Sequence, residues 1–326
     1  MAEFRTYTAI GQREDLSNTI YNIAPTETPV VSSIGKTKAT ATYHEWQTDD
    51  LAAAVATGLK EGFDAAGASD TPTVRVGNRT QIQGKTVHIS GTLDAVDKAG
   101  RKTETAYQLA KAGQELKRDM EKTIMGNVAQ TTGGADAVRL LGSLQTWLLT
   151  NYSTIATGAT AAGPVGGNGT AIRTKSSAAQ ATVAFTEGAL KATVKSCFEN
   201  GGNPTMLVVS PFLKQVVSSF AGIAAQRYQA PTNKQTTIMG AADVYLSDFG
   251  TLSVVPDRFL TPDYATTGDQ AFVLDPSMLA IATLRPFQSN LLAKTGDSEK
   301  HQMLSEYTLQ VSNQKAHGIV ADIKNT

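Results

Sequence analysis

The amino-acid sequence predicts an α+β protein in which a long helix and a terminal series of strands flank an α/β segment. Three observations lead to this prediction. Residues 103–126 carry an apolar stripe with helical spacing, residues 186–260 alternate between helix and strand patterns, and residues 271–320 contain several short apolar runs typical of strands. An extended arm and a long excursion precede the helix.

Composition places the chain among globular proteins. Its 326 residues are 41% hydrophobic, and 29 lysines and arginines balance 29 aspartates and glutamates. A strongly basic nucleic-acid-binding surface is therefore not predicted, although a local basic face stays open. Cys197 is the single cysteine, which excludes an internal disulfide bond and a Cys-x-x-Cys metal site.

The sequence predicts neither a membrane span nor a secretory signal. No stretch approaches the roughly 18 apolar residues of a membrane helix, and the first residues lack a basic segment followed by an apolar one. Because the chain begins with Met1, we expect an N-terminus that is not trimmed.

Residues 1–50 are predicted to form an arm. Apolar residues are sparse, and the prolines of "APTETPVVSS" favour an extended backbone. Because an extended arm cannot bury itself, it must lie on its own body or on a neighbouring chain. The candidate contact residues of the arm are Ile23, Pro25 and Val30.

Residues 55–79 are rich in Gly, Ala, Ser, Asp and Thr, and they predict a long excursion. A strand follows, in which Val87 and Ile89 alternate with polar residues, while Ile82 has the opposite parity and predicts a bulge or turn near Gly84. Together they indicate a protruding hairpin with a functional loop. Its candidate contact residues are Leu59, Phe63 and Val74.

The long helix is predicted to begin after its N-cap Thr103 and to end at Gly126, about 23 residues or roughly 35 Å. Its apolar stripe consists of Leu109, Ala112, Leu116, Met120 and Ile124. The segment "QELKRDMEK" is either a solvated face or a subunit contact with complementary charges.

Two low-complexity stretches, residues 129–138 and 156–182, follow the helix, and the second predicts an exposed loop. Thr186 then caps a helix whose apolar face runs to Phe198, and Ser210-Pro211 begins another. The polar run "AAQRYQAPTNKQTT" predicts an exposed loop, with Arg227, Tyr228 and Pro231 as candidate contacts. The terminal strands are expected to pack against the long helix.

Three short motifs imitate a penicillin-binding or β-lactamase site: Ser33-Ile34-Gly35-Lys36, Ser247-Asp248-Phe249 and Lys294-Thr295-Gly296. Such a serine opens a buried helix, yet Gly35 and a polar β-branched segment follow Ser33, and Phe249 stands where an amide is needed. We instead expect residues 294–300 to form a polar turn built on Gly296-Asp297.

The sequence predicts no catalytic, cofactor-binding or metal-binding residues. His44 and Glu45 are adjacent, so on an extended segment they point to opposite faces and do not share a site. No pair of histidines has zinc-ligand spacing, and "GPVGGNGT" lacks the Gly-Lys-Ser/Thr end of a phosphate loop.

The order of arm, excursion, long helix, α/β segment and returning strands resembles the major capsid proteins of tailed bacteriophages, which have the Hong Kong 97 phage fold. The segments "GNRTQIQGKTVHISGT", "RKTETAYQLAKAGQELKRDME", "LRPFQSNLLAKTGDSEK" and "EYTLQVSNQKAHG" are similar to the capsid family of phage SU-ten. The resemblance spans nearly the whole chain and is most specific over residues 78–126 and 254–318.

The resemblance implies a division into five parts. They are an N-terminal arm (1–50), an extended E-loop hairpin (51–95), the spine helix of the peripheral P-domain with its following loops (96–184), the axial A-domain (185–264) and the P-domain β segment (265–326). Lys294 and Asp297 would connect P-domain strands and touch neighbouring subunits.

The resemblance further implies a non-enzymatic protein that self-assembles into hexamers and pentamers of an icosahedral head. Its implied partners are other copies of itself, portal and scaffold or decoration proteins, and packaged double-stranded DNA bound non-specifically on the inner face. Its implied location is the virion capsid, with assembly in the host bacterial cytoplasm. The near-zero net charge fits this function, because strong like charge on every subunit opposes close packing.

Other hypotheses stay open at this point: a serine acyl-transfer enzyme using Ser33, Lys36 and Lys294, and a decoration or tail protein. In some shells of this fold, an E-loop lysine forms an isopeptide bond with an asparagine of another subunit. Lys60 and Lys85 lie in the corresponding region, but no motif specifies the asparagine, so a cross-link is not predicted.

Overall fold

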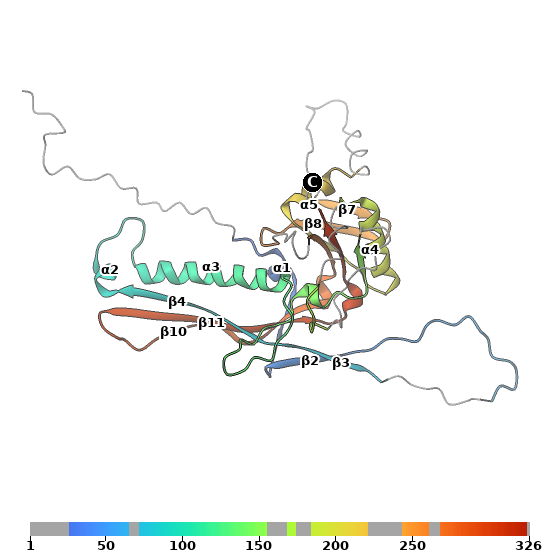
Figure 1. Cartoon of the computed structure of the whole chain (residues 1–326), viewed down its shortest axis with the longest axis horizontal. Helices are drawn as coiled ribbons and strands as arrows, with labels where there is room; N and C mark the ends of the chain where they lie inside the picture. The colour runs from blue at the N-terminus through green and yellow to red at the C-terminus, as the bar shows by residue number, and fades with distance from the viewer. Residues whose placement is uncertain are drawn as a thin grey trace, which may run out of the picture.

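The structure is a computed structural model that describes residues 26–64, 72–154, 168–173, 184–220, 243–260 and 268–324. A body of sheet and helices carries two projections in opposite directions (Figure 1). The described helices are α1 (Pro29–Ser33), α2 (Gly91–Ala95), α3 (Glu104–Met125), α4 (Glu187–Glu199) and α5 (Pro211–Ser218), with short 3-10 turns at Leu144–Thr146, Pro276–Met278 and Gln314–Ala316.

The described strands fall into three sheets. The first has the order β1 (Gly35–Lys38), β10 (Leu279–Leu291), β11 (Ser298–Val311), β4 (Gln81–Ser90). The second has the order β5 (Tyr152–Thr154), β12 (Gly318–Ile323), β9 (Asp269–Leu274), β6 (Met206–Val209), β8 (Gly250–Pro256), β7 (Val244–Ser247). The third is a hairpin of β2 (Tyr43–Thr48) and β3 (Val74–Arg79).

The first sheet extends from the body as a projection covered by α3 (Figure 1). This projection is called the arm below and is distinct from the N-terminal arm. β11 pairs antiparallel with β4 from Ser298↔Ser90 to Tyr307↔Gln81 without a register shift. The predicted bulge near Gly84 is therefore wrong. Gly84 lies opposite Leu304, and a Cβ at residue 84 would come within 2.6 Å of Leu304 Cδ2, so glycine gives that side chain its space. Ile82 has the opposite parity because it lies on the exposed face.

The long helix is confirmed as α3, which ends at Met125 with Gly126 as its C-cap. Thr103 occupies the N-cap in an extended conformation but makes no side-chain cap hydrogen bond. The apolar stripe is buried at Ala112, Leu116, Met120 and Ile124. The neighbouring charges are not one solvated face, because Glu121 belongs to the buried face of the helix.

The Glu121 carboxylate caps α1, accepting hydrogen bonds from the backbone N–H groups of Val30 and Val31 at 2.8 Å each. Burial raises the pKa of Glu121 to about 7, although these hydrogen bonds oppose the shift. The expectation of an extended backbone here is wrong, because Pro29 occupies the first turn of a helix, where it needs no N–H partner. Val30 is 0% exposed because it packs in the core of its own chain, so no neighbouring copy can contact it.

The second sheet contains the predicted α/β segment. The Thr186 and Ser210 side chains accept hydrogen bonds from Ala189 N and Leu213 N, which confirms both predicted N-caps. The prediction that the apolar face of α4 runs to Phe198 is wrong. Phe198 is exposed and packs on Phe249 with ring centroids 4.9 Å apart. The terminal residues do not all return to the long helix. β9 and β12 join the second sheet beside β6 and β5, and β10 and β11 form the arm.

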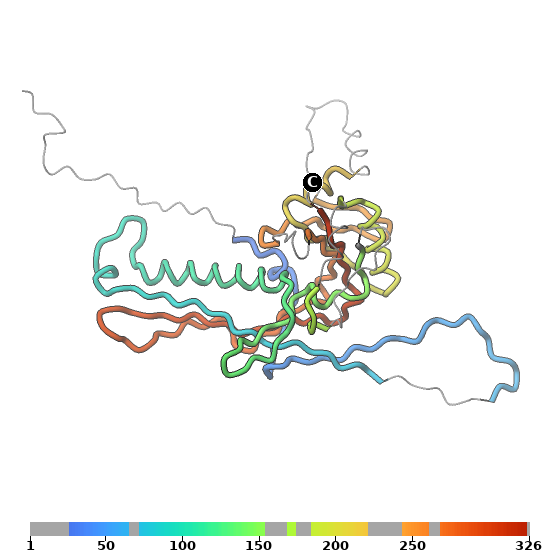
Figure 2. Tube along the Cα trace, viewed as in Figure 1, coloured from blue at the N-terminus to red at the C-terminus, as the bar shows by residue number. Residues whose placement is uncertain are grey.

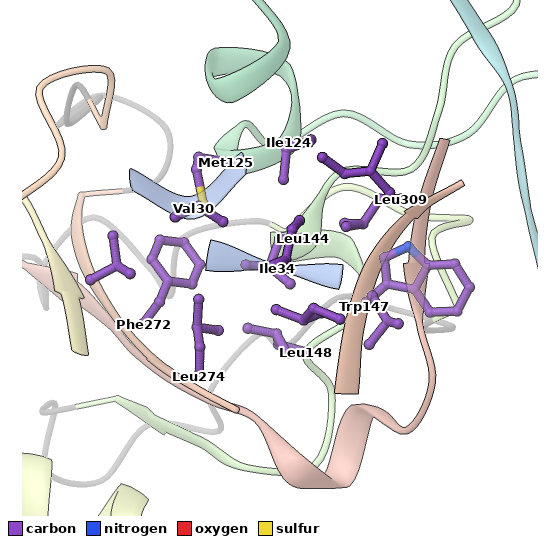
Figure 3. Packing of buried hydrophobic residues seen from close by; sticks show 14 of the residues in the cluster. Val30, Ile34, Ile124, Met125, Leu144, Trp147, Leu148, Phe272, Leu274 and Leu309 are labelled. Carbon is purple, nitrogen blue, oxygen red and sulfur yellow. The ribbon is translucent and has the colours of Figure 1, made fainter. Parts of the chain in front are cut away.

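Two apolar clusters lie on the two sides of the second sheet. Figure 3 shows the first, where Val30 and Ile34 from the N-terminal part meet Ile124, Trp147 and Leu309. The second cluster packs α4 and α5 against the sheet. The first cluster joins the arm, the N-terminal part and the sheet into one body, so both projections start from a fixed base.

One prediction concerns His317, which precedes β12 and is 0% exposed. Burial lowers its pKa to about 4, and its Nδ1 accepts a hydrogen bond from Asp275 N at 3.2 Å. In the unfolded chain the imidazole takes up a proton near pH 6.5, whereas in the folded chain it stays neutral until about pH 4. The free energy of unfolding is therefore at its full value above pH 6.5 and falls as the pH drops from 6.5 towards 4. The loss is about 3 kcal/mol in the free energy of unfolding.

The measurement compares urea unfolding of the unassembled chain and of His317→Asn at several pH values. Asparagine keeps an acceptor for Asp275 N but does not titrate. The difference in pH dependence between the two proteins reports the titration of His317 alone. It removes the contribution of Glu121, whose raised pKa changes the free energy of unfolding with pH in the opposite direction. Equal pH slopes for both proteins would contradict the assignment.

Candidate assembly surfaces

The loop between β2 and β3 is the most exposed apolar segment that the structure describes. Residues 49–64 contain no helix or strand and project away from the body (Figure 2). Large apolar side chains recur every four residues. They are Leu51, Val55, Leu59 and Phe63, with exposed fractions of 98%, 83%, 75% and 49%. Val74, at the start of β3, is also exposed. The predicted contacts Leu59, Phe63 and Val74 thus share this projection, and their role stays a prediction.

The base of the hairpin is firmly attached to the body. The buried Asn78 amide donates to the carbonyl oxygens of Gly142 and Leu309, at 2.9 and 2.8 Å, and its oxygen accepts from Gly142 N at 2.8 Å. Trp46 packs on Trp147 with ring centroids 5.3 Å apart. The loop therefore projects from an ordered base.

A cluster of charges around the buried Glu306 connects the hairpin to the arm, and no periodic pattern in the sequence indicates it. The Glu306 carboxylate forms ion pairs with Arg139 and Arg285 and accepts a hydrogen bond from the Thr80 hydroxyl at 2.8 Å. Because two cations and a hydroxyl surround it, this acid is satisfied although it is nearly fully buried.

The tip of the arm is the turn between β10 and β11, residues 292–297. The sequence predicted a turn over residues 294–300, but Ser298 already begins β11. Gly296 has φ +97°, a left-handed conformation that suits glycine. The Asp297 carbonyl accepts a hydrogen bond from Gly91 N at 3.2 Å and so joins the turn to α2. Lys294 is exposed and lies 4.0 Å from Glu299. Both Lys294 and Asp297 are at the surface, but whether they touch a neighbour stays a prediction.

A groove of about 310 Å³ runs between α3 and β4 on the arm. Its apolar lining is Val87, Ile89, Leu93 and Ala112. Lys85 lies in it and binds Asp119 at 3.0 Å and Glu115 at 3.7 Å, a pairing that raises the Lys85 pKa. The rest of the lining is polar or charged: Lys85, Thr86, His88, Glu104, Gln108, Lys111 and Glu115.

The acyl-transfer arrangement is not assembled. The Ser33 hydroxyl ends α1 and donates to Pro29 O at 2.7 Å. Lys36 pairs with Ile281 at the start of β10, whereas Lys294 lies beyond Leu291 at its far end. At about 3.3 Å per residue, roughly 30 Å separate these ends, so the three side chains cannot share a site.

The histidine and acid of "HEW" also point apart. His44 Nε2 lies 3.0 Å from Gln310 Oε1, while Glu45 pairs with Arg75. Over the described ranges, no group of three His, Cys, Asp or Glu side chains is arranged to hold a metal ion. None of the helices in those ranges is long and apolar enough to cross a membrane.

Some predicted contacts lie outside the described residues: Ile23, Pro25, Arg227, Tyr228 and Pro231.

Comparison with protein families gives a match over almost the entire chain. A family model described as SU10 major capsid protein matches residues 4–324. The major capsid protein of Escherichia phage Phieco32 is 38% identical over 134 residues, which are 41% of this chain and 38% of that protein. The chain therefore aligns with well under half the length of this curated relative.

Solved structures with the same fold match from end to end at low sequence identity. A chain from Mycobacterium phage Adephagia gives a TM-score of 0.60 at 11% identity, covering 100% of this chain and 99% of that one. The capsid of a native GTA particle gives 0.58 at 12% identity, covering 98% and 97%. The SrpI encapsulin complex of Synechococcus elongatus PCC 7942 gives 0.57 at 9% identity, covering 99% and 97%.

Asn78 provides a second prediction. Asn78→Ala removes the hydrogen-bond partners of Gly142 and Leu309 at a buried position, and leaving such groups unpaired lowers the free energy of unfolding by about 3 kcal/mol. Chemical denaturation of the unassembled chain measures this. The control Gln47→Ala, on the exposed side of the same hairpin, should change stability by less than about 0.5 kcal/mol. A loss as small for Asn78→Ala as for the control would show that Asn78 does not hold the hairpin.

Proposed function

The chain belongs to the SU10 major capsid protein family, and from this premise we propose that its copies associate head to tail into hexamers and pentamers of an icosahedral head around DNA. The family, and the Hong Kong 97 phage fold that its structural relatives share, are those that the sequence predicted. The finer statements, on capsomers and on the contents of the head, are proposals.

One observation supports the proposal above all others. The apolar loop and the arm project from opposite ends of the body (Figure 2). A loop that exposes four large apolar side chains is stabilised when a neighbour covers them. Because the donor and acceptor surfaces differ, the contact is heterologous, and such contacts close into rings when the rotation between copies permits. Rings of five and six are the units from which an icosahedral shell is built.

We assign the parts of the capsid fold with changed limits. The hairpin of β2 and β3 with its loop corresponds to the E-loop, residues 43–79 in place of 51–95. The P-domain contains α3 with the arm strands β4, β10 and β11. The A-domain contains α4, α5 and β6 to β8, and it includes β9 and β12 because these strands belong to its sheet. The N-terminal arm ends before α1, since α1 belongs to the core.

Further partners follow from the family. A closed head that receives DNA needs a portal for entry and scaffold or decoration proteins for correct size, and the inner face meets the duplex without reading its sequence. Because the chain carries no excess of positive charge, its contact with the DNA phosphates would be weak. The chain would assemble in the bacterial cytoplasm. The acyl-transfer alternative is not favoured, because its three side chains lie apart, and a decoration or tail role is not favoured for a family of major capsid proteins.

Electron microscopy of the chain expressed alone or with a scaffold protein tests the proposal. Uniform shells or capsomer-sized rings are expected. A protein that stays monomeric at high concentration under both conditions contradicts the proposal.

The loop supplies a third prediction. The double substitution Leu59→Asp and Phe63→Asp should abolish assembly, because two charges replace apolar contacts in the interface. The free energy of unfolding should change by less than about 0.5 kcal/mol per substitution, since both side chains are exposed in the single chain.

The matched control is Lys60→Asp, which places a new acid beside Leu59 but leaves the apolar row intact. Native-gel analysis and electron microscopy report assembly, and denaturation reports stability. Normal shells from the double variant would show that the loop is not an assembly contact.

A further inference from the structure

We propose that Lys315 is a positioning residue for assembly, because its ion pair with Asp50 sets the direction in which residues 49–64 leave the body. The inference rests on the proposed function, in which this loop contacts another copy, and it identifies what holds the loop before that contact forms. The rows of the hairpin of β2 and β3, taken from its base outwards, provide the evidence.

The inner rows of the hairpin are held by the body. In the row of His44 and Asn78, both side chains form hydrogen bonds with the body. In the next row, Trp46 and Val76 pack against the first apolar cluster, and Trp46 also packs on Trp147. Up to this row, direct contacts therefore fix the position of the hairpin.

The last row of the hairpin borders a cavity instead. Thr48 pairs with Val74 at the end of the ladder, and both line a cavity of about 190 Å³ between the hairpin and the body. The body side of this cavity is formed by Trp147, Asn168, Val311, Asn313, Gln314 and Lys315. Val74 is also largely exposed. Side-chain packing therefore leaves the end of the hairpin room to move towards or away from the body.

One ion pair connects the two sides of this cavity. The Lys315 ammonium group donates a hydrogen bond to Asp50 Oδ2 at 2.6 Å. Among the residues that the structure describes, this is the one ion pair or hydrogen bond that joins the body to residues 47–64 or 72–75. Because Asp50 is the second residue of the loop, the pair acts where the loop begins.

Lys315 is itself held in place by the body. It belongs to the short 3-10 turn Gln314–Ala316, which separates β11 from β12. Its N–H group donates to the side-chain oxygen of Asn313 at 3.0 Å, and its carbonyl oxygen accepts from the side-chain amide of the buried Asn151. With its backbone fixed at both ends, the lysine can hold Asp50 at one distance from the body.

The pair is suited to set a direction more than to stabilise the fold. The Lys315 and Asp50 side chains are 34% and 67% exposed. Exposed ion pairs contribute little to the free energy of unfolding, because water and salt screen their charges. A chain without the pair should therefore fold with unchanged stability, whereas the start of the loop would no longer keep one position. This difference separates a positioning residue from a structural one.

Pulsed electron paramagnetic resonance of the full, unassembled chain tests the proposal. Spin labels are attached to Ala52→Cys at the start of the loop and to Ala192→Cys on α4, both at exposed positions. Cys197 is 0% exposed, and burial raises its pKa to about 12, so it stays unlabelled. The measurement gives the distribution of distances between the start of the loop and the body.

The unsubstituted pair should give one narrow distribution. Lys315→Asp places two acids against each other and should broaden the distribution at least twofold, and Lys315→Met, which removes only the charge, should broaden it less. Exchange of the two charges, Lys315→Asp with Asp50→Lys, should restore the narrow distribution. The matched control Lys111→Asp breaks an exposed ion pair with Glu115 within α3 and should change nothing. Chemical denaturation verifies that each variant keeps the stability of the parent chain.

Assembly provides the second readout. Electron microscopy should show particles of mixed size or incomplete shells from Lys315→Asp, and uniform shells from the exchanged pair. Neighbouring copies meet the loop at one angle only when its direction is set, so loss of the pair should make the shells irregular.

Three outcomes would overturn the proposal: an unchanged distance distribution in Lys315→Asp, a broadening that the charge exchange does not reverse, or uniform shells from Lys315→Asp. Where Lys315→Asp does not fold, Lys315→Met and the exchanged pair decide by the same criteria. Failure of the unmodified chain to form shells counts instead against the proposed function, because the distances are measured on single chains.

Discussion

The structure depends on one continuous strand. β11 pairs with β10 on one side and with β4 on the other, and it runs from the tip of the arm into the buried core at Tyr307 and Leu309. α3 lies over the same strands, and its buried acid Glu121 fixes α1 to the core. Since one strand belongs to both regions, the arm cannot pivot freely on the body. The distance between the arm and the base of the hairpin of β2 and β3 is therefore fixed by hydrogen-bonded structure.

This rigidity explains why the chain is incomplete alone. The body buries two apolar clusters and satisfies its internal charges, for example Glu306 between two arginines. The loop cannot do the same, because it projects away from every surface that could cover it (Figure 2). Folding of one chain thus leaves the apolar side chains of the loop uncovered. The proposed association would cover these side chains, and a head-to-tail contact favours rings over symmetric pairs.

Local sequence patterns predicted the elements that local forces determine. The apolar stripe of α3, the caps Thr186 and Ser210, and the turn at Gly296 each follow from interactions within a few residues. Features set by distant partners were missed. β9 and β12 have ordinary strand patterns, and periodicity does not say which sheet a strand joins. Glu121 resembles a surface charge because the N–H groups that it binds are about ninety residues away in sequence. Val30 was assigned to an exposed arm for the same reason. The loop was recognised because its composition lacks any means of burial.

A cryo-electron microscopy reconstruction of the assembled particle tests the central claim most directly. Density for residues 49–64 is expected to lie against an adjoining copy, with Leu51, Val55 and Leu59 covered by that copy. Density that folds this loop onto its own chain, or that leaves it projecting into solvent within a closed shell, would contradict the account.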